Sequence, residues 1–333
     1  MAIVIFLEVY VLVGTGIMVL ALARQTTTRI WAVAAALVFV IGAVCNFRLW
    51  FQNTHDCWIV VLAVDLVIAG FCWCRPLQGW KSAVGWGLLG GLCAMINPIV
   101  ALTWGVLSAA VMIRERAWYR FGIAALIAAL TLTPWIVRNY LVFGRLIPVK
   151  SNAPYELYQS QCRQKDGLLR DFNGHPYGSA GPERQRYKEV GEMKFIDEKR
   201  EIFWKAVAAD PLDFADRVAC RCLGATLWYV PFNRHETTTR PWSVWTYRVL
   251  HPLPFLALLF LGVTVLRRRL HWAQWGVMGV YLLYILPYIG VSYYERYAMP
   301  LLGVKVLLVL WAADRLLELL WLGFDGLRLK TPA

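Results

Sequence analysis

Long stretches of this chain contain almost no charged side chains. Hydrophobic residues make up 59% of the 333 residues, whereas Asp, Glu, Lys and Arg together make up only 17%. The mean hydropathy of +0.51 excludes an ordinary soluble domain. A bilayer core about 30 Å thick is spanned by about 20 apolar residues in an α-helix, and several runs approach or reach that length. The sequence therefore predicts an all-α polytopic membrane protein.

Several motifs of soluble enzymes are also absent. The chain has no Gly-rich phosphate loop, no HExxH pair and no Gly-x-Ser-x-Gly turn around a nucleophile. Its eight cysteines lack the paired spacing of a zinc site. Acidic residues are scarce, at 21 against 34 Lys and Arg, which gives a net charge of +13. We attribute this excess to the cytoplasmic loops of a membrane protein rather than to nucleic acid binding.

What is present is a succession of apolar runs interrupted by one long polar segment. The runs predict helices at 3–23, 30–51, 57–74, 84–96, 98–113, 119–137, 244–266, 272–291 and 300–322. The fourth and fifth form a broken pair, because Pro98 disfavours the α conformation in Asn97. The chain is thus divided into N-terminal transmembrane helices (1–137), the polar segment (138–241), and C-terminal transmembrane helices with a short cytoplasmic tail (242–333).

The basic residues of the short loops predict the orientation. With the N-terminus outside, the short basic loops fall on the cytoplasmic side, as the positive-inside rule requires. Segment 138–241 is then extracytoplasmic, and we expect in it a Gly- and Pro-rich loop at 174–182, a helix at 183–209 and an amphipathic stretch at 213–232. Because the cytoplasmic loops are too short to bind a nucleotide, any substrate comes from the lipid or from the outer compartment.

The first candidate site is the pair His55 and Asp56, in the short outer loop before the third predicted helix. A carboxylate near the apolar boundary can act as a general base or hold a divalent metal ion. The alternative is a solvated helix cap, since Asp at a helix N-terminus satisfies unpaired N–H groups and the helix dipole.

The second candidate lies where the sixth helix leaves the membrane. Arg138 and Asn139 stand there, and Arg145 and Lys150 follow shortly after. Basic groups at this depth suit a lipid-linked phosphate, because Arg offers a bidentate fork and Lys a point charge. The alternative is that these side chains lay their apolar stems along the membrane interior and extend their charged ends to the lipid headgroups.

Three further polar positions complete the candidates. Glu295 and Arg296 form either a structural ion pair or part of a phosphate site, since Arg at the outer end of a helix opposes the positive-inside bias. Arg234 lies in the polar cluster 233–236, whose spacing is too tight for a metal site. Asp65, in the middle of a predicted helix, should face the bundle interior.

Three stretches resemble one group of membrane enzymes. Gly87–Pro98 is a Gly-rich helix that ends in an Asn-Pro break. Thr133–Tyr140 (TPWIVRNY) is followed by Phe-Gly-Arg at 143–145 and by PVKSN at 148–152, and Tyr294–Pro300 reads YERYAMP. Together they resemble the bacterial membrane glycosyltransferases of the GT-C type, which include protein mannosyltransferase-like enzymes and the lipid A aminoarabinose transferase.

The resemblance implies a GT-C-like helical bundle with an extracytoplasmic helical insert, in the inner membrane of a bacterium. Such a protein would transfer a sugar from a polyprenyl-phosphate donor to an acceptor on the outer face. The resemblance makes Asp56 the catalytic candidate, and we expect Arg138, Lys150 and Arg296 to converge on one lipid phosphate. No cofactor is implied beyond the alternative of a divalent metal ion.

The chain departs from that group at its beginning. Members usually start with a further helix and a first outer loop that holds the catalytic carboxylate, whereas Met1 opens on what resembles a later helix. The chain is therefore either an enzyme, complete or complemented by a second chain that supplies this part, or a non-catalytic subunit or polyprenyl-phosphate-binding membrane protein of the same fold. A transporter is the least favoured class, because no internal repeat accompanies the single broken helix pair.

Overall fold

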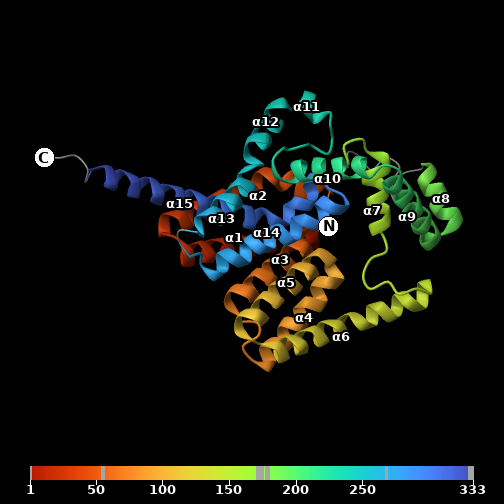
Figure 1. Cartoon of the computed structure of the whole chain (residues 1–333), viewed down its shortest axis with the longest axis horizontal. Coiled ribbons are helices and arrows are strands. Elements are labelled where there is room, and N and C mark those ends of the chain that lie inside the picture. Colours follow the sequence, from red (N-terminus) through yellow and green to blue (C-terminus); the bar gives the residue numbers. More distant parts are fainter. Residues whose placement is uncertain (1, 54–56, 170–175, 177–180, 267–268, 329–333) are drawn as a thin grey trace.

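The computed structural model describes residues 2–53, 57–169, 176, 181–266 and 269–328, and these are mostly helical (Figure 1). The apolar bundle contains α1 (Ala2–Thr26), α2 (Arg29–Asn53), α3 (Cys57–Trp73), α4 (Trp80–Ile96), α5 (Pro98–Glu115), α6 (Trp118–Phe143), α12 (Pro241–Leu250), α13 (Leu253–Thr264), α14 (Trp272–Val291), the 3₁₀ helix η2 (Glu295–Leu301) and α15 (Leu302–Arg328). The polar segment, here called the insert, contains α7 (Ala153–Tyr158), the π-helical turn η1 (Gln159–Arg163), α8 (Pro182–Val190), α9 (Glu192–Ala209), α10 (Pro211–Thr226) and α11 (Glu236–Thr239).

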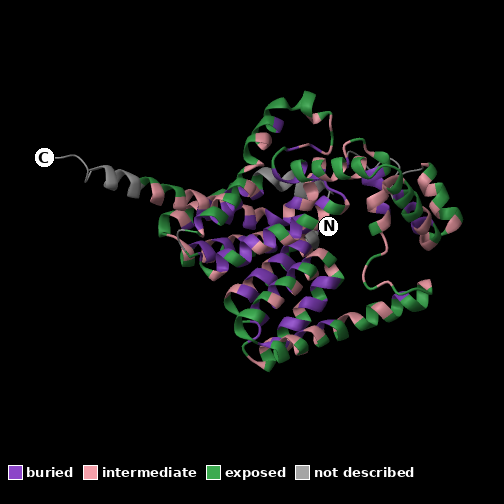
Figure 2. Cartoon of the chain, viewed as in Figure 1, coloured by how far each residue is buried: buried purple, intermediate pink, exposed green. Residues whose placement is uncertain are grey.

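Five stretches of the described helices are long and apolar enough to cross a bilayer: Ile5–Thr26, Pro98–Glu115, Trp118–Phe143, Pro241–Thr264 and Trp272–Val291. Two shorter apolar stretches accompany them, at Arg29–Val44 and Cys57–Trp73. Buried residues gather in the middle of the bundle, while exposed apolar side chains cover its outer faces (Figure 2). The expected all-α, multi-pass membrane protein is thus confirmed.

Glycines allow the closest helix contact in the bundle. Gly87 and Gly91, one turn apart on α4, lie against α6. A Cβ at Gly87 would come within 2.4 Å of the Ala124 carbonyl oxygen, and one at Gly91 within 2.5 Å of the Thr131 Cβ. Membrane helices approach closely through such small residues, since lipid tails supply no hydrophobic drive for association. The Gly-rich stretch of the sequence therefore has a packing role.

The short basic loops meet at one end of the bundle. Arg114, at the end of α5, stacks over Trp272 at the start of α14, 4.1 Å from the ring centroid. Arg120 donates a hydrogen bond of 3.0 Å to the carbonyl of Leu77. The other ends of α5 and α14 meet where Asn97 donates to the Tyr288 hydroxyl, and the insert lies at that end. The bundle therefore has a basic-loop end and an insert end.

Asp65 pairs inside the bundle. The Thr15 hydroxyl on α1 donates a hydrogen bond to the Asp65 carboxylate on α3, and it also donates to the carbonyl of Val11. A carboxylate inside an apolar bundle needs such a donor, because an unpartnered buried charge is costly. The expectation that Asp65 faces the bundle interior is confirmed. Its hydrogen bond with Thr15 gives Asp65 a structural role between α1 and α3.

Two expected helices are each divided in two. Gly191 separates α8 from α9, and its φ of +77° is a conformation that glycine adopts without a Cβ penalty. Pro252 lies between α12 and α13 and has no N–H to continue the hydrogen bonding of α12. The expected single helix at 183–209 is therefore wrong in its continuity, whereas the expected membrane helix at 244–266 is present as the span Pro241–Thr264, interrupted at Pro252.

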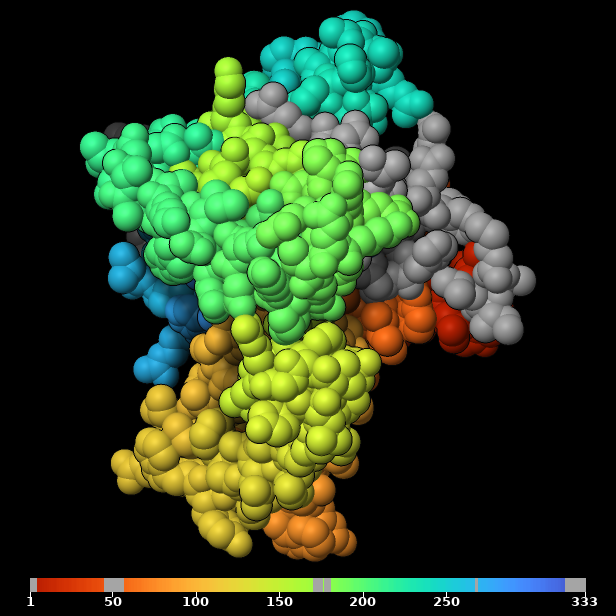
Figure 3. Space-filling model, turned by 90° about the vertical axis from the view of Figure 1, so that its right-hand side faces the viewer, coloured from red at the N-terminus to blue at the C-terminus, as the bar shows by residue number. Residues whose placement is uncertain are grey.

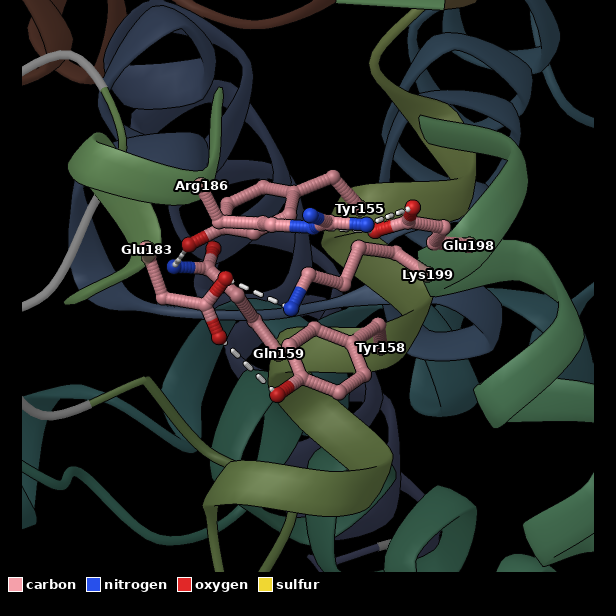
Figure 4. A network of polar contacts seen from close by, with 7 residues as sticks. All are labelled: Tyr155, Tyr158, Gln159, Glu183, Arg186, Glu198 and Lys199. Carbon is pink, nitrogen blue, oxygen red and sulfur yellow. Dashed lines mark hydrogen bonds and ion pairs between the residues drawn. The ribbon is translucent and has the colours of Figure 1, made fainter. Parts of the chain in front are cut away.

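The insert has a small core of its own. Tyr155 of α7 packs with Phe195 and Ile196 of α9. Beside them the buried Lys199 ammonium forms an ion pair of 2.5 Å with Glu183 of α8 (Figure 4). Lys199 also lies over the Tyr158 ring, and the Tyr158 hydroxyl donates to Glu183. Because a buried charge must be paired, this network holds α7, α8 and α9 in one arrangement.

Arg221 fixes the insert to the bundle. This fully buried side chain of α10 donates from Nε to the carbonyl of Ile289 (2.7 Å) and from Nη2 to that of Gly290 (3.2 Å). The Ser160 hydroxyl of η1 donates to the next carbonyl, Val291, at 2.6 Å. Carbonyls in the last turn of a helix lack partners within the helix, and a cation there also favours the helix dipole. The insert thus caps the end of α14.

A second contact joins the insert to the end of α6. The Arg145 guanidinium, just after that helix, forms an ion pair with Asp197 of α9. Figure 3 shows the insert helices in green above the yellow end of α6. The loop that follows α6 is therefore held between the bundle and the insert.

Candidate functional site

His55 and Asp56 lie outside the described residues. The helix that they precede, α3, begins at Cys57, whose thiol lies within electrostatic range of the Tyr294 phenol. The start of α3 thus lies beside the segment that leads into η2. Asp56 stays a prediction.

The contacts of Arg138 are within its own helix. The helix α6 continues through Phe143, so Arg138 lies within a helix rather than after one. Its exposed guanidinium stacks over Trp135, 5.2 Å from the ring centroid, and donates to the Asn139 side chain. Within the described part of the chain, its recorded contacts are all with α6. No recorded contact links Arg138 to Lys150 or Arg296.

Asn139 has a structural role in the described fold. Its buried amide donates a hydrogen bond of 2.9 Å to the carbonyl of Ile147. One turn earlier, the Trp135 indole donates to the carbonyl of Val149 at 3.1 Å. These two contacts fold the loop back against α6 and determine where Lys150 begins its path into the insert.

Lys150 and Arg296 do meet one group of side chains, although 146 positions separate them. The group surrounds Glu156 of α7, and we call it the Glu156 cluster: Lys150, Asn152, Glu156, Ser292, Tyr294, Arg296 and Tyr297. Lys150 lies within electrostatic range of the Glu156 carboxylate. Arg296 donates to the Tyr294 hydroxyl, and Tyr294 lies within electrostatic range of Glu156. The structure thus brings two of the three predicted phosphate ligands to one place.

The Glu156 carboxylate is held in an environment that favours its neutral form. Burial raises the pKa of Glu156, and this effect exceeds the opposing effects of its hydrogen bonds and of Lys150. The Ser292 hydroxyl donates to the carboxylate at 3.0 Å, and Asn152 and Tyr297 donate to it as well. A carboxyl whose pKa is raised by burial is a candidate for proton exchange with a substrate.

Stacked tyrosines connect this cluster to the helix break at Asn97. The rings of Tyr288 and Tyr297 stack with centroids 4.1 Å apart, and Tyr294 packs against Tyr297 edge-on at 4.5 Å. The Asn97 side chain accepts from the N–H of Ile99 in the first turn of α5 and donates to the Tyr288 hydroxyl at 3.3 Å. The expected broken helix pair is confirmed, and its polar break faces the tyrosines.

Glu295 has different neighbours from Arg296. It accepts a hydrogen bond from the Tyr229 hydroxyl and lines a cavity that the Glu156 cluster does not line. Burial raises the pKa of Glu295 above its ordinary value. Arg234 forms an ion pair of 2.9 Å with Asp166, which joins two loops of the insert. That pairing explains Arg234 as a structural residue.

Sequence reasoning did not select Glu156 or Lys305. Glu156 stands in the first turn of a six-residue helix, where an acidic residue is an ordinary preference, so no local signal marked it. Lys305 lies one turn into the apolar helix α15 and also lines the cavity. An isolated Lys in an apolar run is a signal of function that was available in the sequence.

The arrangement can bind an anion between Lys150 and Arg296 and exchange a proton at Glu156. Among the described residues, no group of three or more His, Cys, Asp or Glu could hold a metal ion. Comparison of this chain with protein-family models, with curated proteins and with solved structures finds no match.

Proposed function

We propose that the chain is a membrane glycosyltransferase-like protein that transfers a sugar from a polyprenyl-phosphate donor to an acceptor. The supporting observation is the meeting of Lys150, Arg296 and Glu156 at the insert end of the bundle. Two cations suit a phosphate, and charge-assisted bonds to phosphate are stronger than neutral ones. The apolar faces of the bundle suit the long chain of a lipid-linked donor.

In this reaction the acceptor oxygen bonds to the anomeric carbon of the sugar, and the bond from that carbon to the phosphate oxygen breaks. Lys150 and Arg296 stabilise the negative charge that stays on the departing polyprenyl phosphate. Glu156, in its ionised form, takes the proton from the acceptor hydroxyl. Tyr294 and Tyr297 hold Arg296 and Glu156 in place by hydrogen bonds.

The proposal includes an orientation in a bacterial inner membrane, with segment 138–241 extracytoplasmic. It is supported by the gathering of the short basic loops at the end opposite the insert. A single cysteine at position 178, in an otherwise cysteine-free chain, should react with a membrane-impermeant thiol reagent in intact cells. Reaction only after permeabilisation would reverse the orientation and exclude an outer-face activity.

Binding of a polyprenyl phosphate to the purified protein tests the site. We expect Arg296→Lys and Lys150→Gln each to weaken binding about tenfold or more, since Lys cannot reproduce a bidentate fork. Lys81→Gln, at the basic-loop end, is the matched control and should bind as the wild type does. The structure also predicts that Arg138→Gln binds normally, whereas the sequence alone predicts a loss.

Turnover separates the enzyme from the non-catalytic alternative. With a labelled polyprenyl-phosphate sugar, Glu156→Gln should abolish transfer while leaving binding of the polyprenyl phosphate within about threefold of the wild type. Binding without transfer in the wild type itself would favour a lipid-binding subunit. Normal binding by both Arg296→Lys and Lys150→Gln would remove the Glu156 cluster as the phosphate site.

A further inference from the structure

A cavity of about 300 Å³ lies beside η2, between α2, α12, α13 and α15. Its volume is at the lower end of the range of ligand sites, which is roughly 300–1,000 Å³. Most of its lining is apolar, and the polar side chains in it are Tyr229, Tyr247, His251, Tyr293, Glu295 and Lys305. No residue of the Glu156 cluster lines this cavity, so the two are separate sites, and both include residues of η2.

The cavity opens through an apolar rim. Val38 of α2 and Leu250 and Leu253 of α12 and α13 line it, yet they are 44%, 52% and 39% exposed. Residues that both line a cavity and reach the surface mark its mouth. In a membrane-spanning bundle this surface faces lipid tails, so the mouth suits an alkyl chain.

Lys305 lies in this cavity without a counter-ion. Within the described part of the chain, its ammonium group has no hydrogen bond or ion pair. His251 lies within electrostatic range of Lys305, and its ring contacts the carbonyl of Gly224 at 3.0 Å. Lys305 is partly buried, and an ammonium group in such apolar surroundings is stabilised by an anionic partner, because an unpaired charge away from water is costly. An anionic group of a ligand would supply that partner.

Two further polar groups lie at the η2 side of the same cavity. The Tyr293 side chain is 3% exposed, and its buried hydroxyl has no hydrogen-bond partner among the described residues. Beside it, the Glu295 carboxylate accepts from the Tyr229 hydroxyl. A carboxylate offers about four acceptor positions, so it can also accept from a ligand cation. The cavity therefore combines an unpaired cation, an unpaired hydroxyl and a carboxylate.

We propose that this cavity binds one membrane phospholipid with a phosphoethanolamine headgroup. The phosphate lies against Lys305, the ammonium lies against Glu295, and the Tyr293 hydroxyl donates to the phosphate. In such a lipid the phosphate lies nearer to the acyl chains than the ammonium does. The protein groups follow the same order, since Lys305 lies further into the apolar helix α15 than Glu295 does. The first part of an acyl chain leaves through the rim at Leu253. A phosphoglycerol lipid or a polyprenyl phosphate offers no cation to Glu295, and charge complementarity therefore favours the zwitterionic headgroup.

Native mass spectrometry of the delipidated full chain tests this proposal. The protein is mixed with equal amounts of phosphatidylethanolamine and phosphatidylglycerol, and retained lipid is measured; polyprenyl phosphate is left out because the Glu156 cluster is proposed to bind it. We expect preferential retention of phosphatidylethanolamine, a loss of about tenfold or more in Lys305→Met, and loss of the headgroup preference in Glu295→Gln. Lys81→Gln, which removes an exposed charge at the other end, should leave retention unchanged.

Other outcomes would overturn the proposal. Equal retention of the two lipids by the wild type, preference for phosphatidylglycerol, or unchanged retention in Lys305→Met would each do so. Should Lys305→Met fail to fold, Leu253→Trp decides, because it narrows the exposed rim and leaves every charge in place. Normal phosphatidylethanolamine retention in Leu253→Trp would then exclude the cavity. None of these results depends on sugar transfer, so this proposal and the proposed function can fail separately.

Discussion

The contact between α4 and α6 makes a quantitative prediction about Gly87. In Gly87→Ala the new Cβ would lie 2.4 Å from the Ala124 carbonyl oxygen and 2.9 Å from the Ile127 Cβ. Both distances are far shorter than an ordinary van der Waals contact. Neither atom can rotate away, because the Ala124 oxygen belongs to the backbone and the Ile127 Cβ is bonded directly to it. The two helices must therefore move apart locally.

The magnitude follows from two opposing terms. Overpacking of a well-packed site costs about 1–3 kcal/mol. Replacing glycine by alanine within a helix stabilises that helix by up to about 1 kcal/mol, which offsets part of this cost. We therefore expect Gly87→Ala to lower the free energy of unfolding by about 1–2 kcal/mol. Gly85→Ala is the matched control on the same helix, since a Cβ there meets nothing within 4 Å, and it should be neutral or stabilising.

Unfolding in mixed micelles with increasing SDS, followed by tryptophan fluorescence and circular dichroism, measures the difference between these variants. The reasoning requires Gly87→Ala to be the less stable of the two by at least about 1 kcal/mol. If Gly87→Ala proves as stable as Gly85→Ala, the close approach of α4 and α6 does not exist in the membrane.

Two other substitutions test the roles assigned at the insert end. Asn139→Ala should lower the free energy of unfolding by about 1–3 kcal/mol, because it leaves the carbonyl of Ile147 without its donor; a loss of lipid-phosphate binding with unchanged unfolding would instead make Asn139 a ligand. Burial raises the pKa of Glu156, so its contribution to stability is present at acidic pH and is lost as the pH rises through that raised value. Thermal unfolding of Glu156→Gln and of the wild type, measured from pH 4 to pH 8, should therefore show the variant increasingly more stable than the wild type as the pH rises. Parallel dependences of the two unfolding temperatures on pH would contradict a buried carboxylate.

The membrane class and the helix positions were predictable because they depend on local composition. Runs of apolar residues, the proline after Asn97 and the basic loops each act within a few residues of the chain. Breaks within polar helices were harder to predict. Gly191 is one of 25 glycines, and its positive φ is required by the packing of α8 against α9 rather than by its neighbours in sequence.

The candidate site was predictable only in part, because its contacts join residues far apart in the chain. Arg138 and Lys150 are close in sequence, yet α6 extends past Arg138 and the loop pinned by Asn139 carries Lys150 into the insert. The docking of the insert on the end of α14 then brings Glu156 to Ser292. No periodic pattern encodes a contact across 136 positions, and a capping-type acidic residue carries no mark of such a role.

The short 3₁₀ helix η2 explains why neighbouring residues of one motif serve different sites. Side chains in a 3₁₀ helix follow one another at three per turn, about 120° apart, so consecutive residues face different surroundings. Glu295 accordingly reaches the cavity and the Tyr229 hydroxyl, while Arg296 contacts Tyr294 in the Glu156 cluster. Adjacent Glu and Arg suggest an ion pair when read as sequence, but this geometry gives each a separate partner. A ligand at either site would therefore press on the same seven residues of η2, which is the physical basis for any coupling between the two proposed sites.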